Sequence, residues 1–96
     1  MDVNEIIWRP DPETAAKTRM ARFMRQHGLA TVADLQRRSI DDPEWYWDAV
    51  SRDLGFHWFT PYRSVRDAWK GIAWARWFPG GRHNLSYNAI DRHVAA

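Results

Sequence analysis

The sequence predicts a small, mainly α-helical domain of three to four helices, with extended aromatic-rich segments and at most a short strand pair. The helices are predicted from an Asp-Pro-Glu start signal that occurs twice, at residues 11–13 and 42–44, each time followed by apolar residues at helical spacing. The extended segments are predicted from aromatic runs in the second half that contain proline or alternate in polarity. Because the chain has only 96 residues, its core must be modest.

The first helix is expected over residues 12–27. Asp11 can cap its free N–H groups, Pro12 has no N–H to leave unpaired, and Glu13 suits the positive end of the helix dipole. Gly28 ends the helix. The apolar stripe of the helix consists of Ala16, Met20, Phe23, Met24 and His27. The other side carries Lys and Arg residues, which we interpret as a solvated face; the alternative is a docking surface for an acidic neighbour or a phosphate.

A short second helix is expected over residues 32–39, and a third over residues 43–54. Thr31 and Asp34 have a spacing close to that of a capping box, which begins the second helix and turns Leu35 inward. The apolar stripe of the third helix consists of Trp47, Val50 and Leu54, and Gly55 ends this helix.

The chain between residues 56 and 78 is expected to be largely extended. Residues 56–62 are aromatic and contain a proline, which disfavours a helix before it. Residues 63–71 predict a turn or a short helix. Residues 72–78 alternate as one short strand does. Because a lone strand cannot pair with itself, its expected partner is either residues 56–59 or a strand that this sequence does not contain.

A distinctive run of residues lies near the end of the chain. Two aromatic residues lead into a Pro-Gly-Gly turn, an asparagine that can cap a helix follows, and a second asparagine and Asp-Arg-His come at fixed offsets. This run resembles the junction in AMP-forming acetyl- and acyl-CoA synthetases, where W-F-x-x-G precedes x-L-N and an N-x-x-D-R-H helix. The matching positions are Trp77, Phe78, Gly81, Asn84, Asn88, Asp91, Arg92 and His93, whereas His83 replaces the usual Leu.

The resemblance covers nearly the whole chain. Further matches in the family's order and spacing are Trp8-x-Pro, Phe23-Met24, Leu35 with Ser39, and Asp42-Pro43-Glu44 with Trp47 in place of the usual Phe-Trp pair. The resemblance implies an N-terminal domain of this family at residues 1–83 and the start of the first helix of the adenylate-forming core at residues 84–96. Residues 91–96 contain no Gly, Asn or Pro to end a helix, so we expect a fragment of a longer protein.

The family's activity is implied only for a parent enzyme. In such a ligase a carboxylate and ATP form an acyl-adenylate with the help of Mg²⁺, and CoA then takes the acyl group as a thioester. The family's phosphate loop, its adenine and magnesium motifs and its C-terminal lysine have no counterpart here. We therefore expect this chain alone to be inactive, to bind no ATP, Mg²⁺ or CoA, and to pack against the core domain or synthetase subunits.

The acid used by the parent stays open among acetate, propionate, acetoacetate and longer acids. Residues 8–13 are more similar to acetoacetyl- and general acyl-CoA synthetases than to acetate-specific ones.

Other catalytic patterns are weak in this sequence. The four histidines form neither His-x-His nor an i, i+4 pair, and no serine lies in a nucleophile elbow. The acidic residues between positions 41 and 48 suit helix capping better than paired-carboxylate catalysis. The Pro-Gly-Gly-Arg turn at residues 79–82 lacks the Lys and Ser or Thr of a phosphate loop, so we interpret it as a tight turn.

Composition argues against several classes of protein. Cysteine is absent, the net charge is +2, and no apolar run reaches membrane-spanning length. We therefore expect a cytoplasmic chain that binds neither nucleic acid nor a membrane. The weighed alternatives are a helix-turn-helix protein using Arg37 and Arg38, and an interfacial anchor at residues 74–78. Seven tryptophans suit a surface that packs on something larger, so the isolated chain should self-associate, and a stand-alone interaction module of this fold remains an alternative.

Overall fold

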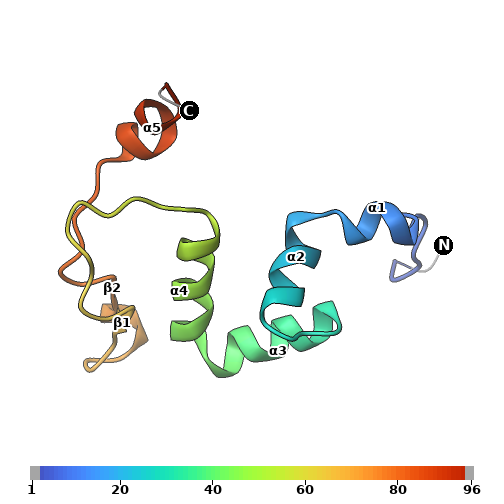
Figure 1. The fold of residues 1–96 in the computed structure, drawn as a ribbon. Helices are drawn as coiled ribbons and strands as arrows, with labels where there is room; N and C mark the ends of the chain where they lie inside the picture. The colour runs from blue at the N-terminus through green and yellow to red at the C-terminus, as the bar shows by residue number, and fades with distance from the viewer. Residues whose placement is uncertain (1–2, 95–96) are drawn as a thin grey trace. The chain divides into compact units, whose positions relative to one another are not determined.

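The computed structural model describes residues 3–94, so residues 1–2 and 95–96 of the two expected domain ranges lie outside the described part (Figure 1). Within residues 3–94 the structure is mainly helical, as predicted, with five α-helices and one two-stranded antiparallel sheet. The chain divides into two compact units, and the boundary falls between Arg37 and Arg38.

In the first unit, α1 (Pro12–Ala16) begins where a helix is predicted. Oδ1 of Asp11 accepts the N–H of Thr14 at 2.9 Å, which confirms the predicted cap. The helix ends after five residues, at its C-cap Lys17.

A separate helix, α2 (Arg19–Gln26), follows, so the prediction of one helix over residues 12–27 is wrong. Thr18 is the N-cap of α2, and its hydroxyl accepts the N–H of Ala21 at 3.1 Å. A capping threonine inside an otherwise periodic stretch favours a new helix start over continuation of the old helix, because its side chain competes for backbone N–H groups. Gly28, with φ of 67°, ends α2 as predicted.

The helix α3 (Val32–Asp41) runs past its predicted end at Ser39. Its predicted cap is confirmed, because Oγ1 of Thr31 accepts the N–H of Asp34 at 3.1 Å. Leu35 is buried, as predicted.

The second unit is built on α4 (Pro43–Asp53), whose bounds agree with the prediction. Oδ1 of Asp42 accepts the N–H of Trp45 at 3.1 Å, and the chain turns at Gly55, where φ is 64°. From there an extended segment (yellow in Figure 1) leads to a hairpin, and the returning chain (orange) runs beside it. The pairing of Thr60 with Arg82 in an isolated β-bridge joins these two segments.

The hairpin differs from the prediction of a strand over residues 72–78. Ile72–Trp74 form a 3₁₀ turn, and only β2 (Arg76–Trp77) is a strand, paired antiparallel with β1 (Arg66–Asp67). The predicted partner segment, residues 56–59, is also wrong. The observed partner, residues 66–67, is nearer in the chain than residues 56–59, so pairing with it closes a shorter loop at a lower entropic cost. Gly71, with φ of 102°, provides the backbone conformation that the turn requires.

The chain continues into a helix over residues 85–94, which consists of a first α-helical turn, a π-helical segment (Tyr87–Asp91) and α5 (Arg92–Val94). Oδ1 of Asn84 accepts the N–H of Tyr87 at 2.9 Å, so the predicted cap is confirmed. Within the second unit, the hairpin lies beside the N-terminal end of α4, and α5 lies beyond the other end (Figure 1).

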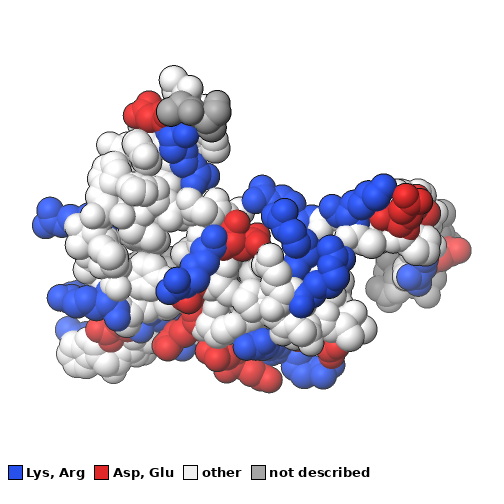
Figure 2. Space-filling view, in the orientation of Figure 1, with Lys and Arg blue, Asp and Glu red and all other residues white. Residues whose placement is uncertain are grey.

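Apolar side chains remain widely exposed in the part of the chain that the structure describes. Phe23, Leu35 and Ala49 are the buried apolar residues there. The face seen in Figure 2 shows positive and negative residues interspersed, with broad uncharged surface over the second unit. A core this small leaves much of the aromatic content available for contacts with other molecules.

Candidate functional site

The motif asparagine Asn88 is buried, with 5% of its surface exposed. Its Oδ1 accepts the N–H of His57 at 2.7 Å, and its Nδ2 donates to the carbonyl of His57 at 3.0 Å and to that of Asn84 at 3.2 Å. The side-chain amide thus pairs with the backbone of His57 as a neighbouring peptide does in a β-ladder. Asn84 and Asn88, four residues apart, therefore have distinct roles: one begins the helix and the other attaches it.

The motif arginine Arg92 makes a second attachment. Its guanidinium donates to the carbonyl of Gly55 and, at 3.4 Å, to that of Leu54, and its Nε donates to Nε2 of His93 at 3.3 Å. Leu54 is the C-cap of α4 and Gly55 follows it. Carbonyls at the end of a helix have no helical partners and lie at the negative end of the helix dipole, so a guanidinium is well suited to this position. We call the contacts of Asn88 and Arg92 with residues 54–57 the latch.

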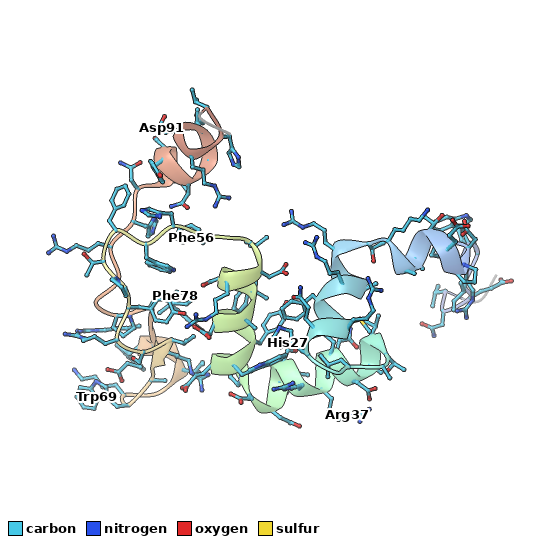
Figure 3. All side chains as sticks on the ribbon, in the orientation of Figure 1. His27, Arg37, Phe56, Trp69, Phe78 and Asp91 are labelled. Carbon is cyan, nitrogen blue, oxygen red and sulfur yellow. The ribbon has the colours of Figure 1, made fainter. Side chains whose placement is uncertain are left out.

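Asp91 takes no part in the latch. Its side chain lies on the helix surface (Figure 3), is exposed, and makes no hydrogen bond or ion pair with residues 3–94. The structure therefore accounts for Arg92 of the Asp-Arg-His motif and leaves the role of Asp91 unexplained.

The motif turn at residues 78–81 has a defined geometry. The carbonyl of Phe78 accepts the N–H of Gly81 at 3.0 Å, Pro79 occupies the second position, and Gly80 has φ of 84°, as a type II turn requires. Gly81 needs to be glycine for another reason, since a Cβ there would lie 2.6 Å from Cζ3 of Trp58.

An aromatic cluster surrounds Trp58. Its ring centroid lies 4.9 Å from that of Phe56, 5.1 Å from Tyr62, 5.2 Å from Phe78 and 5.5 Å from His83. His83, the departure from the family pattern, therefore packs as an aromatic ring where an aliphatic side chain is usual. Sequence reasoning overlooked Trp58, although a tryptophan between two aromatic residues is a recognisable signal.

A groove of about 350 Å³ lies between this cluster and α4. Phe56 and Phe78, labelled in Figure 3, line it from the two segments opposite the helix. The full lining is Trp47, Val50, Ser51, Leu54, Phe56, Trp58, Phe78 and His83. With Ser51 and His83 as its polar members, this lining suits apolar contact better than chemistry.

A polar contact ties the segment after α4 back to that helix. The hydroxyl of Tyr62 donates to Oδ1 of Asp48, and Nε of Arg52 donates to Oδ2 at 3.0 Å. The hydrogen bond from Tyr62 holds the pKa of Asp48 below its usual value, and burial raises the pKa of Tyr62. Asp48 is therefore a structural carboxylate.

The motif tryptophans Trp47 and Trp77 meet edge to face, with ring centroids 6.2 Å apart. The guanidinium carbon of Arg66 lies 5.9 Å from the Trp77 ring, and Nε of Arg66 lies 3.8 Å from Oε1 of Glu44. These contacts hold the hairpin beside the start of α4.

Two motif residues lie in the first unit. Trp8 is 75% exposed, whereas Phe23 is buried with its ring 4.6 Å from His27. The other motif residues lie in the second unit, where Trp47 and Trp77 meet beside the start of α4 and Asn88 and Arg92 contact the chain just after its end. The full set there is Trp47, Trp77, Phe78, Gly81, Asn84, Asn88, Asp91, Arg92 and His93.

Within residues 3–94, the backbone of the glycine turn is engaged in contacts of its own. The Gly81 N–H is already donated within its turn, and the side chain of Arg63 lies against Gly80. Across residues 3–94 there is no group of three or more His, Cys, Asp or Glu side chains that could hold a metal ion. Nor does any helix in that range have the length and apolar character needed to cross a membrane.

Comparison with known proteins finds a family match that spans most of the second unit. Residues 32–89 match the family model described as acetyl-coenzyme A synthetase N-terminus. The acetyl-coenzyme A synthetase of Deinococcus radiodurans is 38% identical over 88 residues, which are 92% of this chain and 12% of that protein. The corresponding enzyme of Rhizobium rhizogenes is 38% identical over 80 residues, 79% of this chain and 12% of that protein.

A solved structure is similar as well. An acetoacetyl-CoA synthetase from Streptomyces lividans superposes with a TM-score of 0.74 at 26% identity, over 91% of this chain and 15% of that one. The chain thus spans about an eighth of the length of the curated relatives it matches. Since the family model covers more than half of the 96 residues, including the capping Asn84 and the latch residue Asn88, this chain belongs to the acetyl-coenzyme A synthetase N-terminus family.

Proposed function

We propose that this chain is the N-terminal domain of an AMP-forming acid–CoA ligase and that it has a structural rather than a catalytic role. In our proposal residues 1–83 form the domain, and residues 84–96 begin the helix that leads into the adenylate-forming core, in the cytoplasm. The observation that carries the proposal is the use of the family-motif residues: Asn84 caps the helix, and the latch residues Asn88 and Arg92 hold it to residues 54–57. Such use leaves them to define the junction and not to handle substrate.

ATP, Mg²⁺ and CoA belong to the parent enzyme in this proposal. Bound there, ATP with Mg²⁺ supplies the activated phosphate and CoA the acceptor thiol. The described residues do not fit these groups, because the glycine turn is closed by its own hydrogen bond and by the ring of Trp58. The acid substrate is not specified by this chain, since its pocket would lie in the core.

The partner that we propose is the adenylate-forming core. Exposed large apolar residues on the second unit support this partner, because a surface of this kind is normally covered by other protein. A stand-alone interaction module of the same fold, which binds a synthetase or itself, is the second candidate and is favoured by the same exposed residues.

A chimera tests the proposal. In an acetyl-CoA synthetase relative, the segment equivalent to this chain is deleted or replaced by residues 1–96, and acetate-dependent ATP–pyrophosphate exchange and thermal stability are measured. We expect the deletion to lose stable, active enzyme and the chimera to regain it with the host's KM for acetate. A chimera that stays as unstable as the deletion would contradict the proposal.

The isolated chain supplies the second readout. We expect calorimetry to find no saturable binding of Mg-ATP or CoA to the 96-residue chain. Saturable binding of either ligand would show that the chain contributes to a substrate site. If the free chain instead binds an intact synthetase tightly and cannot replace the host segment, the interaction module is the better description.

A further inference from the structure

The helix over residues 85–94 is attached to the rest of the second unit at two points that differ in kind. Asn88 makes two hydrogen bonds with the backbone of His57, and Arg92 reaches the carbonyls that end α4. One attachment fixes the position of a helix but still permits rotation and tilt, whereas two attachments fix its direction.

The π-helical segment decides where the second attachment lies. The N–H of Arg92 donates to the carbonyl of Tyr87, five residues back, instead of the four of an α-helix. An α-helix turns by about 100° per residue, so it would place Arg92 about 40° to one side of Asn88. The extra residue of a π turn rotates the following residues back by up to about 100°, which moves Arg92 to the other side of Asn88.

We propose that Asn88, Arg92 and the π turn between them form a positioning device that fixes the direction in which the helix leaves the second unit. The π turn selects the side of the helix from which Arg92 meets the end of α4. Because π turns are intrinsically unfavourable and rare, the hydrogen bonds of the latch are what hold this one in place. The inference rests on the proposed function only for the destination of the helix, which in a synthetase would be the core.

Deletion variants of the full 96-residue chain distinguish this device from an ordinary helix. Removing the exposed Ile90 takes the extra residue out of the π turn and leaves Asn88 and Arg92 with an α-helical i, i+3 spacing on the same side. We expect the latch to survive, with the amide exchange protection of His57 within threefold of the unmodified chain. The matched control is deletion of the exposed Ser86, which lies in the α-helical first turn and shifts Asn88 relative to its cap; we expect it to lower that protection at least tenfold.

Point variants test the direction itself. Residual dipolar couplings report the orientation of residues 85–94 relative to α4. With Arg92→Met we expect these couplings to change or average out while those of α4 stay unchanged, and with Arg92→Lys, which keeps one donor group, we expect a partial return. Asn88→Ala should lower the exchange protection of the His57 amide at least tenfold.

Two results would overturn the device: loss of His57 protection on deletion of Ile90 as large as on deletion of Ser86, or unchanged couplings in Arg92→Met. Variants that fail to fold are recognised by loss of the α4 amide signals, and Arg92→Lys and Arg92→Met, which alter a half-buried surface side chain and leave the chain length unchanged, then decide the question. These measurements need no synthetase, so the device can fail while the chimera succeeds, and the reverse.

Discussion

Gly81 lies directly against the indole ring of Trp58, such that a Cβ on Gly81 would be 2.6 Å from Cζ3 and 2.9 Å from Cε3 of that ring. The ring has little freedom to move, because Phe56, Phe78 and His83 pack around it. We therefore expect Gly81→Ala to lower the free energy of unfolding by roughly 1–3 kcal/mol, the range found for overpacked sites. Urea unfolding, followed by tryptophan fluorescence, measures this change in the free energy of unfolding.

A matched control separates this clash from backbone strain. Gly28 has φ of 67°, and a Cβ added to it would meet nothing within 4 Å, so Gly28→Ala tests strain alone, at about 1 kcal/mol. In the double variant Gly81→Ala with Trp58→Leu, the smaller side chain removes the clash, and the added effect of Gly81→Ala should largely vanish. An undiminished effect there would mean that the Trp58 ring is not the obstacle.

The contact between Tyr62 and Asp48 predicts a pH dependence of stability. The hydrogen bond from Tyr62 lowers the folded pKa of Asp48, so its contribution is present above the unfolded Asp pKa of about 3.9 and is lost as pH falls through the lower folded value. The raised pKa of Tyr62 means that the donor stays protonated until above about pH 10. Tyr62→Phe should therefore lower the free energy of unfolding by about 1 kcal/mol at neutral pH, with the difference shrinking below about pH 4.

The control for this pH effect is Arg52, the other partner of Asp48. Its side chain is 76% exposed, and exposed ion pairs contribute little, so Arg52→Met should change stability by less than about 0.5 kcal/mol at neutral pH. Chemical denaturation at several pH values compares the two variants. A larger loss for Arg52→Met than for Tyr62→Phe would assign the stabilisation to the ion pair instead.

The helix starts could be predicted from the sequence, because capping is a local interaction. Asp11, Thr31, Asp42 and Asn84 each accept a backbone N–H about three residues on, which is why their spacing carries the signal. The same rule applied to Thr18 would have divided the first helix. The strand partner could not be predicted in this way, since the alternation of residues 72–78 says nothing about which segment lies opposite.

In the candidate site, the contacts of the latch could not be predicted from the sequence. Family resemblance identified Asn88 and Arg92, but their partners at His57 and Gly55 lie 31 and 37 residues away. Those partners contribute only backbone groups, which every residue has, so no residue type marks them in the sequence. The π turn could not be predicted for the same reason, because no residue type in the sequence signals a backbone hydrogen bond to a carbonyl five residues back.

Trp77 and Phe78 are neighbours in the motif but should differ in their effect on stability. Trp77 is 46% exposed and meets Trp47 edge to face, so Trp77→Ala should lower the free energy of unfolding by about 1 kcal/mol. Phe78 is more buried and packs on both Trp58 and Tyr62, so Phe78→Ala should cost roughly 2–4 kcal/mol.

The backbone at Phe78 provides an internal check. Its φ of 52° is the left-handed conformation, which glycine adopts more readily than alanine. Phe78→Gly should therefore be at least as stable as Phe78→Ala, the reverse of the usual order. Denaturant midpoints in which the alanine variant is clearly the more stable would contradict the left-handed conformation.

Self-association of the isolated chain should involve the hairpin tip. Trp69, Ile72 and Trp74 are 77%, 72% and 70% exposed, and Trp69 lies at the end of the hairpin, away from α4 (Figure 3). Exposed apolar residues grouped on one element favour association with a second surface, here another copy of the chain in the absence of any other partner. We expect sedimentation velocity to show concentration-dependent association that Trp69→Ser with Trp74→Ser weakens at least tenfold, while the helical circular dichroism is unchanged.

Trp8→Ser is the matched control for the hairpin variants, because Trp8 is similarly exposed, at 75%, but belongs to the first unit. If association depends on the hairpin, Trp8→Ser leaves it intact. Equal weakening by Trp8→Ser would indicate that exposed tryptophans cause non-specific association. A strictly monomeric chain at all concentrations would show that the exposed hairpin surface does not cause self-association. Selective weakening by the hairpin variants would instead identify residues 69–74 as the first surface to test for contact with a synthetase core. An apolar surface that associates weakly with a second copy can be part of a larger, permanent interface with another domain.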